Sequence, residues 1–205
     1  MANKPKTDSA HRLAPALPYI LIVGSVIGLI ASFILSLDKL HLLENPNYQP
    51  SCDLNPIISC GSVMKSWQGS AFGFPNSWIG LIAFTTFGLI GLAMLANARF
   101  KRWFWIGLEA GFALGVTFTL WMLFESIYRI GALCPYCLTV DVVTLTMFWY
   151  VTLYNIREGH IPLPSRLIGV GDFARRFHFE ILITTFLIIT AIILQHFWYY
   201  YGRYL

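Results

Sequence analysis

Four cysteines are the residues of this chain with the most specific chemistry. Cys134 and Cys137 form a C-x-x-C pair, with proline and tyrosine between them, where a polar turn meets the start of an apolar run. A helix N-terminus stabilises a thiolate and lowers its pKa, so the first cysteine of such a pair exchanges disulfides readily. The spacing therefore indicates thiol-disulfide redox chemistry.

The other two cysteines, Cys52 and Cys60, lie eight positions apart in a polar connection. Zinc hooks space their cysteines by roughly two to four residues, so we predict no metal site. Structural disulfides are the usual fate of extracellular cysteines, and for Cys52 and Cys60 that interpretation stays open. It fits the C-x-x-C pair poorly, because closing so short a loop restrains little chain entropy.

Composition indicates which solvent surrounds the chain. Of its 205 residues, 57% are hydrophobic and 12% are charged, whereas a soluble domain is about half apolar and about a quarter charged. Lipid must therefore surround most of it, which excludes a soluble redox domain of the glutaredoxin type, where C-P-Y-C also occurs. The net charge of +4 comes from basic residues scattered at the edges of apolar runs, so no nucleic-acid-binding stripe is predicted.

Five apolar stretches are long enough to cross a bilayer, which takes roughly 20 residues per helix. They predict an all-α polytopic membrane protein with no separate soluble domain. A cleaved signal peptide is the alternative for the first stretch, but that stretch exceeds the usual signal core of about 7 to 15 residues and no convincing cleavage site follows. The predicted spans are residues 18–37, 76–97, 103–130, 134–156 and 179–200.

Small residues repeat at every fourth position in the first and third spans. Such faces allow helices to approach closely in a membrane, so we predict helix packing through both of them. The two sets are Gly24, Gly28 and Ser32, and Gly107, Gly111 and Gly115.

The distribution of lysine and arginine decides the predicted orientation. Ten fall on the side of the N-terminus and four on the other side, so the positive-inside rule places the N-terminus in the cytosol. All four cysteines then share the extracytoplasmic face. The ten are Lys4, Lys6, Arg12, Arg99, Lys101, Arg102, Arg157, Arg166, Arg175 and Arg176, and the four are Lys39, Lys65, Arg129 and Arg203.

This orientation also defines the predicted regions. The longest polar connection, 38–75, carries Cys52 and Cys60, and loops of this length are usually functional or disordered. Within it, an amphipathic pattern over Ile57, Ser62–Met64 and Trp67 predicts a short cap lying on the bundle. The regions are a cytosolic tail over 1–17, a four-helix membrane unit over 18–157, a cytosolic connection over 158–178, and a fifth helix with a short outer tail over 179–205.

Three motifs together resemble the vitamin K epoxide reductase family. They are C-x7-C-G-S-V-M from Cys52, F-G-F-P-N-S-x-x-G over Phe72–Gly80, and C-P-Y-C from Cys134. Their order and topology match most closely the bacterial, DsbB-like members, over roughly residues 18–157. The resemblance implies a four-helix bundle that encloses a quinone, with the fifth helix outside the resemblance.

The resemblance also implies roles for the cysteines. Cys137 would lie next to the quinone, and Cys134 would exchange disulfides with Cys60. Cys52 would meet a separate partner, a DsbA-like or thioredoxin-like disulfide carrier. Nucleic acid is not an expected partner.

Two further residues are candidates for the quinone site. Asn76 matches a position where the family places a hydrogen-bond donor to a quinone carbonyl, and the alternative is an asparagine that caps the second span. Asp141 lies one helical turn beyond Cys137, and an intramembrane carboxylate is costly enough to suggest a function, here proton transfer. The alternative is a structural bond to a neighbouring span. Vertebrate members carry a tyrosine at that position, so Asp141 departs from their pattern of quinone binding.

The sequence thus predicts a quinone-dependent thiol-disulfide oxidoreductase of the inner, cytoplasmic membrane. It would reoxidise an extracytoplasmic carrier, pass electrons through both cysteine pairs to ubiquinone or menaquinone, and support disulfide bond formation. The first alternative is a quinone or vitamin K epoxide reductase that uses the same cysteines. The second is a non-enzymatic membrane protein with structural disulfides.

Overall fold

Helices make up almost all of the chain. The computed structural model describes residues 8–162, 164 and 168–202, and these ranges contain helices and no strand, with one isolated backbone bridge. Five of the helices are long and apolar enough to cross a membrane. The prediction of an all-α, multi-pass membrane protein is therefore confirmed. The five spans are Ala16–Glu44, Ser77–Leu95, Arg102–Ile130, Pro135–Arg157 and His178–His196.

The first helix extends beyond its apolar run at both ends. Helix α1 covers Asp8–Glu44, so part of the predicted tail 1–17 is helical, and the predicted loop 38–75 begins at residue 45. Residues 1–7 lie outside the described part of the chain. The sequence-based boundaries were too narrow because they followed hydrophobicity alone.

Contacts with the polar segment that follows α1 stabilise the last two turns of this helix. Asp38 is buried and accepts a 2.8 Å hydrogen bond from the Tyr48 hydroxyl. The Lys39 ammonium donates a 2.5 Å bond to the carbonyl of Met64. Asp38 and Lys39 end the apolar run, but their bonds to residues later in the chain stabilise them in helical conformation. The helix therefore continues past them.

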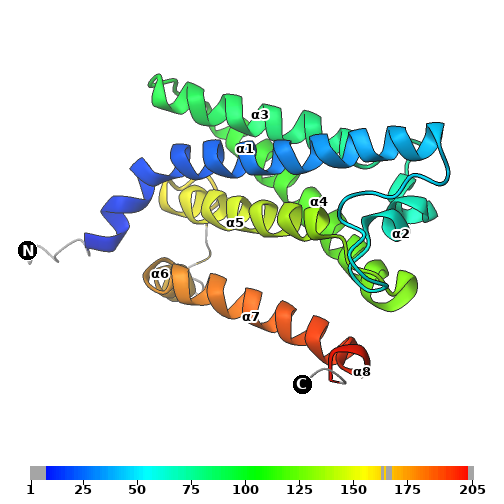
Figure 1. Ribbon diagram of the computed structural model, residues 1–205. Helices are drawn as coiled ribbons and strands as arrows, with labels where there is room; N and C mark the ends of the chain where they lie inside the picture. The colour runs from blue at the N-terminus through cyan, green and yellow to red at the C-terminus, as the bar shows by residue number, and fades with distance from the viewer. Residues whose placement is uncertain (1–7, 163, 165–167, 203–205) are drawn as a thin grey trace, which may run out of the picture.

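Four helices form the bundle: α1, α3 (Ser77–Leu95), α4 (Arg102–Glu125) and α5 (Pro135–Arg157). Helix α1 packs along α3 and α5, and α4 packs along α5 (Figure 1). Stacked rings of Phe87 and Phe112, 4.1 Å apart, join α3 to α4. The main core includes Leu21, Phe84, Phe112, Met147 and Val151.

The two predicted small-residue faces have different outcomes. On α1 the prediction is confirmed: a Cβ added to Gly28 would lie 2.5 Å from the ring of Phe84, so only glycine permits this approach of α3. On α4 the prediction is wrong for Gly107 and Gly111, which have no described atom within 4 Å of such a Cβ. Helix α4 packs instead through large side chains on its other side, among them Trp105, Leu108, Phe112 and Leu123.

A polar cap covers one end of the bundle. It contains α2 (Cys60–Lys65) and a 3-10 turn, η1 (Trp67–Ser70), which confirms the predicted short amphipathic element. Val63 and Met64 form the buried side of α2, whereas Trp67 of η1 is 67% exposed. Figure 1 shows α2 and the start of α5 at this end. Cys60 begins α2, Cys134 is the N-cap of α5 and Cys137 lies in its first turn, and Cys52 is bonded to Cys60, so we call this end the cysteine end.

A change of helix type ends α4 beside the cap. The chain continues as a π-helical turn, η2 (Ser126–Ile130), and then Gly131 adopts a left-handed conformation with φ of 71°. Glycine reaches this conformation without steric cost. The reversal leads directly into Leu133 and Cys134 and so positions the C-x-x-C motif.

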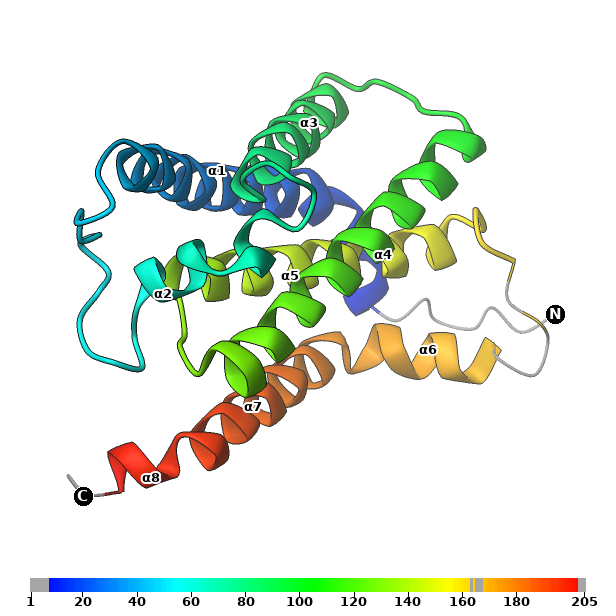
Figure 2. The same cartoon turned by 90° about the vertical axis from the view of Figure 1, so that its right-hand side faces the viewer.

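The fifth spanning helix, α7 (His178–His196), lies beside the bundle (Figure 2). None of its side chains is buried, so its apolar surface is suited to lipid. The sequence did not predict the short amphipathic helix α6 (Ile168–Arg176), which precedes it within the expected connection 158–178. A last turn, α8 (Trp198–Tyr201), follows α7.

Many of the basic residues used to predict orientation lie at or near the ends of the spanning helices. The connection from α3 to α4 and the end of α5 lie at the end opposite the cysteines. Of the residues used to predict orientation, Lys4, Lys6, Arg166 and Arg203 lie outside the described part of the chain. The direction of the bundle across the membrane stays a prediction.

Candidate active site

A disulfide joins the two loop cysteines. The sulfurs of Cys52 and Cys60 are bonded at 2.03 Å, and Cys60 is the first residue of α2. Asp53 fixes this arrangement, because its Oδ1 accepts hydrogen bonds from the amide of Gly61 at 2.8 Å and from the hydroxyl of Ser59 at 3.1 Å. The carboxylate thereby satisfies donors at the start of α2.

A backbone bridge brings the loop to the C-x-x-C motif. The amide of Leu133 donates a 2.6 Å bond to the carbonyl of Ile57, and the amide of Ser59 donates a 2.9 Å bond to the carbonyl of Leu133. Since Cys60 follows Ser59 and Cys134 follows Leu133, the bridge sets the two cysteines side by side. Each bond contributes about 0.5–1.5 kcal/mol, so the bridge aligns the segments without locking them.

The closest approach between the two cysteine pairs joins Cys134 and Cys60. Their sulfurs lie 3.3 Å apart, while Cys134 and Cys137 are free thiols. Reacting atoms about 3–3.5 Å apart are close enough for attack. Cys60 and Cys134 are 0% and 2% exposed, so this contact is shielded from small thiols in solution.

The start of α5 favours the thiolate of Cys134. This residue is the N-cap of α5, and its sulfur accepts a 3.3 Å hydrogen bond from the backbone amide of Cys137. Hydrogen bonding from the Cys137 side chain lowers the pKa of Cys134, and the amides of Cys137 and Tyr136 add to this effect against the opposing effect of burial. The predicted role of the helix N-terminus therefore agrees with the local geometry.

The lowered pKa of Cys134 has a measurable consequence. A lower pKa means that the thiolate forms at lower pH, so the rate of Cys134 alkylation is expected to rise through a midpoint below the value of about 8.5 for a free cysteine. Mass spectrometry of the chain after timed alkylation would measure this midpoint. In Cys137→Ala the midpoint is expected to move up, and a midpoint at or above 8.5 in the parent chain would contradict the assignment.

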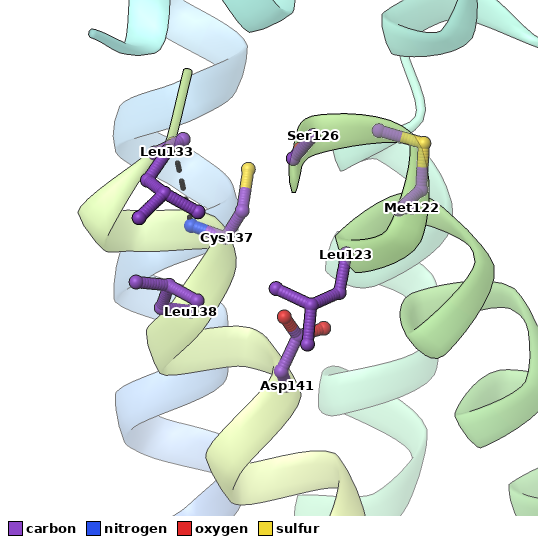
Figure 3. A pocket seen from close by; sticks show the side chains of 8 residues that line it. Met122, Leu123, Ser126, Leu133, Cys137, Leu138 and Asp141 are labelled. Atoms are coloured by element: carbon purple, nitrogen blue, oxygen red, sulfur yellow. Dashed lines mark hydrogen bonds between the residues drawn. The ribbon is translucent and has the colours of Figure 1, made fainter. Parts of the chain in front are cut away.

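Cys137 opens onto a pocket between α4 and α5 (Figure 3). The pocket is small: its empty space amounts to about 260 Å³ even when the open solvent at its mouth is included. Its lining is mostly apolar: Met122, Leu123, Ser126, Leu133, Cys134, Cys137, Leu138 and Asp141.

Asp141 contributes the only charged group among these lining residues. Figure 3 shows its carboxylate one turn of α5 below Cys137, facing the side of Leu123. The hydroxyl of Thr119, on α4, donates a 3.2 Å hydrogen bond to the carbonyl of Val116 on its own helix. Asp141 thus lies one helical turn from Cys137 and lines the same pocket, and its role in proton transfer stays a prediction.

Asn76 lies near the pocket but outside its lining. Its Nδ2 donates to the carbonyl of Gln68 at 2.6 Å, and its Oδ1 accepts from the amide of Ala71 at 3.2 Å. It makes no side-chain capping bond to α3, so that alternative is wrong. Nδ2 also lies 3.7 Å from the sulfur of Met122, which lines the pocket.

Glu125 is a buried acid to which sequence reasoning gave no role. Its Oε2 accepts a 2.9 Å bond from Nε2 of Gln68, and both residues are less than 10% exposed. Through Gln68 it is connected to Asn76. A charged residue near the end of an apolar span was the available signal, but its burial depends on a glutamine 57 positions away in the sequence.

One match to known proteins covers most of this architecture. Residues 19–152 match the vitamin K epoxide reductase family. That range begins within α1, ends within α5 and includes all four cysteines, Asn76 and Asp141, whereas α6 and α7 fall outside it. No match was found among curated proteins.

Proposed function

Because the chain belongs to the vitamin K epoxide reductase family, we propose that it reoxidises an extracytoplasmic thioredoxin-fold carrier and passes the electrons to a membrane quinone. The family consists of membrane oxidoreductases that act on quinones, so the chain is a membrane redox enzyme. The proposal adds the carrier, the direction of electron flow and the roles of the four cysteines. Its bacterial, DsbB-like character belongs to the same proposal.

The 3.3 Å contact between Cys134 and Cys60 carries this proposal. It joins a disulfide, Cys52–Cys60, to a free dithiol, Cys134 and Cys137. Disulfides exchange when a thiolate attacks a neighbouring disulfide sulfur. Two couples in contact can therefore pass an electron pair in either direction, and two isolated structural disulfides would have no need of this contact.

Electron flow begins at the loop pair. One carrier thiolate attacks the sulfur of Cys52, forms a mixed disulfide and releases the thiolate of Cys60. The second carrier thiol then attacks the carrier sulfur of this mixed disulfide, which releases Cys52 as a thiolate and leaves the carrier with its own disulfide. Cys52 is only 7% exposed in its disulfide form. The loop around it must therefore open before the carrier can reach its sulfur.

The electron pair then crosses to the C-x-x-C pair. Cys60 attacks the sulfur of Cys134 in a Cys134–Cys137 disulfide and releases Cys137 as a thiolate. Cys52 next attacks Cys60, which restores the loop disulfide and frees Cys134. The state described here, with the loop pair oxidised and the C-x-x-C pair reduced, is the product of this exchange.

The pocket beside Cys137 is the proposed quinone site, and it would have to widen to admit the ring. Its walls are mostly apolar, Cys137 presents a sulfur, and Asp141 presents a carboxylate. A bound quinone would supply an acceptor for two electrons and two protons. With such an acceptor bound, Cys134 and Cys137 would re-form their disulfide and give up two electrons and two protons, and Asp141 would hold a proton within reach of the same space.

Asp141 should control turnover if it handles a proton. Asp141→Asn is expected to lower quinone-dependent turnover about 10²-fold across pH, because proton transfer by a positioned side chain contributes roughly 10²–10⁴-fold. Quinol formation by the purified chain measures the effect. The matched control is Glu109→Gln, an acid on α4 bonded to Thr152 and Asn155 away from the pocket, which should turn over normally. Full turnover by Asp141→Asn would exclude the proton role.

Reconstitution tests the whole proposal. The purified chain is mixed with a reduced thioredoxin-fold carrier and either ubiquinone or menaquinone, and carrier thiols and quinol are followed together. One disulfide is expected to form for each quinol. Quinone reduction without carrier oxidation, or reduction of a vitamin K epoxide in its place, would favour the epoxide reductase alternative.

The predicted placement in the inner membrane needs its own test. With the N-terminus cytosolic, the cysteine end faces the carrier's compartment. Lys65 and Arg99 are each replaced by cysteine in a background that lacks the four native cysteines. A membrane-impermeant thiol reagent should then label only position 65. Labelling of position 99 alone would invert the orientation and remove the carrier from the pathway.

A further inference from the structure

The fifth helix contacts the redox site through one buried side chain. Phe197 is 0% exposed, although α7, which it follows, has no buried residue along His178–His196. At the other end of α7, the indole of Trp149 donates a 3.0 Å bond to the carbonyl of His178. The helix is thus held at its two ends, and the end at Phe197 lies near the cysteines.

The surroundings of Phe197 are the residues of the backbone bridge and of the pocket wall. Its cluster of buried side chains contains Ile57 and Leu133, whose backbones form the 2.6 Å bond of the bridge. The same cluster contains Leu123, and both leucines line the pocket beside Cys137. The ring therefore fills the space between the fifth helix and the segments that hold Cys60 against Cys134.

We propose that Phe197 is a positioning residue for disulfide exchange. Its ring supports the backbone bridge between residues 57–59 and Leu133, and this bridge holds the Cys60 and Cys134 sulfurs in contact. The bridge has only two backbone bonds, so side-chain packing must supply the rest of its alignment. Close-packed interiors transmit the loss of a large ring to their neighbours. The fifth helix thereby acts on the exchange step without contributing a reacting atom.

The inference rests on the proposed function for its biological meaning, but its test does not need quinone or carrier. The full chain carrying Cys52→Ser and Cys137→Ser retains Cys60 and Cys134 as its two thiols. Diamide oxidises them to one disulfide and takes up the two electrons and two protons. Because both sulfurs are buried, the rate of this reaction, read on gels after alkylation of remaining thiols, is divided by the rate at which iodoacetamide alkylates the same thiols in the same variant. The normalised rate reports how readily the two sulfurs pair once a small reagent has reached them.

Phe197→Ala in this background is expected to slow Cys60–Cys134 disulfide formation about 10- to 100-fold, since a misplacement of about 1 Å can cost 10²-fold. Phe197→Leu, which restores part of the volume, should recover most of the rate. The matched control is Phe112→Ala, another ring with 0% exposure, located in the main core. It should leave the rate within about twofold of the parent.

Two results would overturn the inference: a parental rate in Phe197→Ala, or an equal loss in Phe112→Ala, which would indicate general destabilisation. If Phe197→Ala cannot be recovered folded, Phe197→Leu and Phe197→Val decide by whether the rate follows the side-chain volume. In the complete enzyme, Phe197→Ala should lower kcat and leave the KM for the carrier unchanged, and Phe197→Leu should restore most of kcat. A chain that shows the cross-linking effect but no carrier-dependent quinone reduction would keep this inference and reject the proposed function.

Discussion

Replacing Cys137 by serine is expected to stop quinone reduction, with a loss on the order of 10³-fold or more in steady-state turnover. Cys137 is the cysteine that opens onto the pocket beside Asp141, whereas Cys134 contacts Cys60. A hydroxyl is a far poorer nucleophile and reductant than a thiol, and it cannot form the Cys134–Cys137 disulfide. The electron pair therefore has no exit from the chain.

The same variant should still accept electrons once. Its Cys52–Cys60 disulfide is intact, so about one equivalent of reduced carrier should be oxidised in a burst before the reaction stops. Single-turnover measurement of carrier thiols separates this burst from the lost steady state. Ser126→Ala, which alters the same pocket wall without touching a sulfur, is the control and should keep most of its turnover. Sustained quinol formation by Cys137→Ser would place the electron exit elsewhere.

Hydrophobicity predicted the spans well but could not predict their ends. All five predicted spans form helices, yet α1 continues to Glu44 because Asp38 and Lys39 bind Tyr48 and Met64. Those partners lie up to 25 positions away, beyond the reach of any local pattern. Charge at the edge of an apolar run signals the edge of the lipid and carries little information about the end of the helix.

The small-residue pattern shows a related limit. A repeat of small residues creates a surface that can approach another helix, but it does not say whether a helix will be there. Gly28 meets Phe84 of α3, whereas Gly107 and Gly111 meet no described neighbour. The difference arises from which side of α4 its large side chains occupy, and that is a property of the assembled bundle.

For the site, residue types were predictable and the contacts between distant segments were not. The C-x-x-C spacing and the helix start predicted a reactive Cys134, and the bond from the Cys137 amide agrees with it. The bridge between Ile57 and Leu133 had no sequence signal, because backbone groups of any residue can form it. Glu125 and Phe197 were overlooked for the same reason, since their importance comes from partners far along the chain.

Replacing Cys52 by serine is expected to trap a disulfide between Cys60 and Cys134. In the parent chain Cys52 resolves this mixed disulfide by attacking Cys60; in the variant no thiol is placed to do so. The sulfurs already lie 3.3 Å apart, and the Cys60 thiol is free to attack the Cys134–Cys137 disulfide, which leaves Cys137 as a thiol. Carrier oxidation should fall on the order of 10²-fold or more, because the carrier has lost the sulfur that it attacks.

Peptide mapping under non-reducing conditions distinguishes this outcome from simple inactivation. The linked peptides of Cys60 and Cys134 should dominate in Cys52→Ser, and they should be absent when Cys60→Ser is added, a control that leaves Cys134 and Cys137 able to pair with each other. A trapped species that joins Cys60 to Cys137 instead would assign the exchange to the wrong member of the C-x-x-C pair. Carrier oxidation at the parental rate would mean that electrons enter without the loop pair. The bridge would then hold Cys60 beside Cys134 for a structural reason alone.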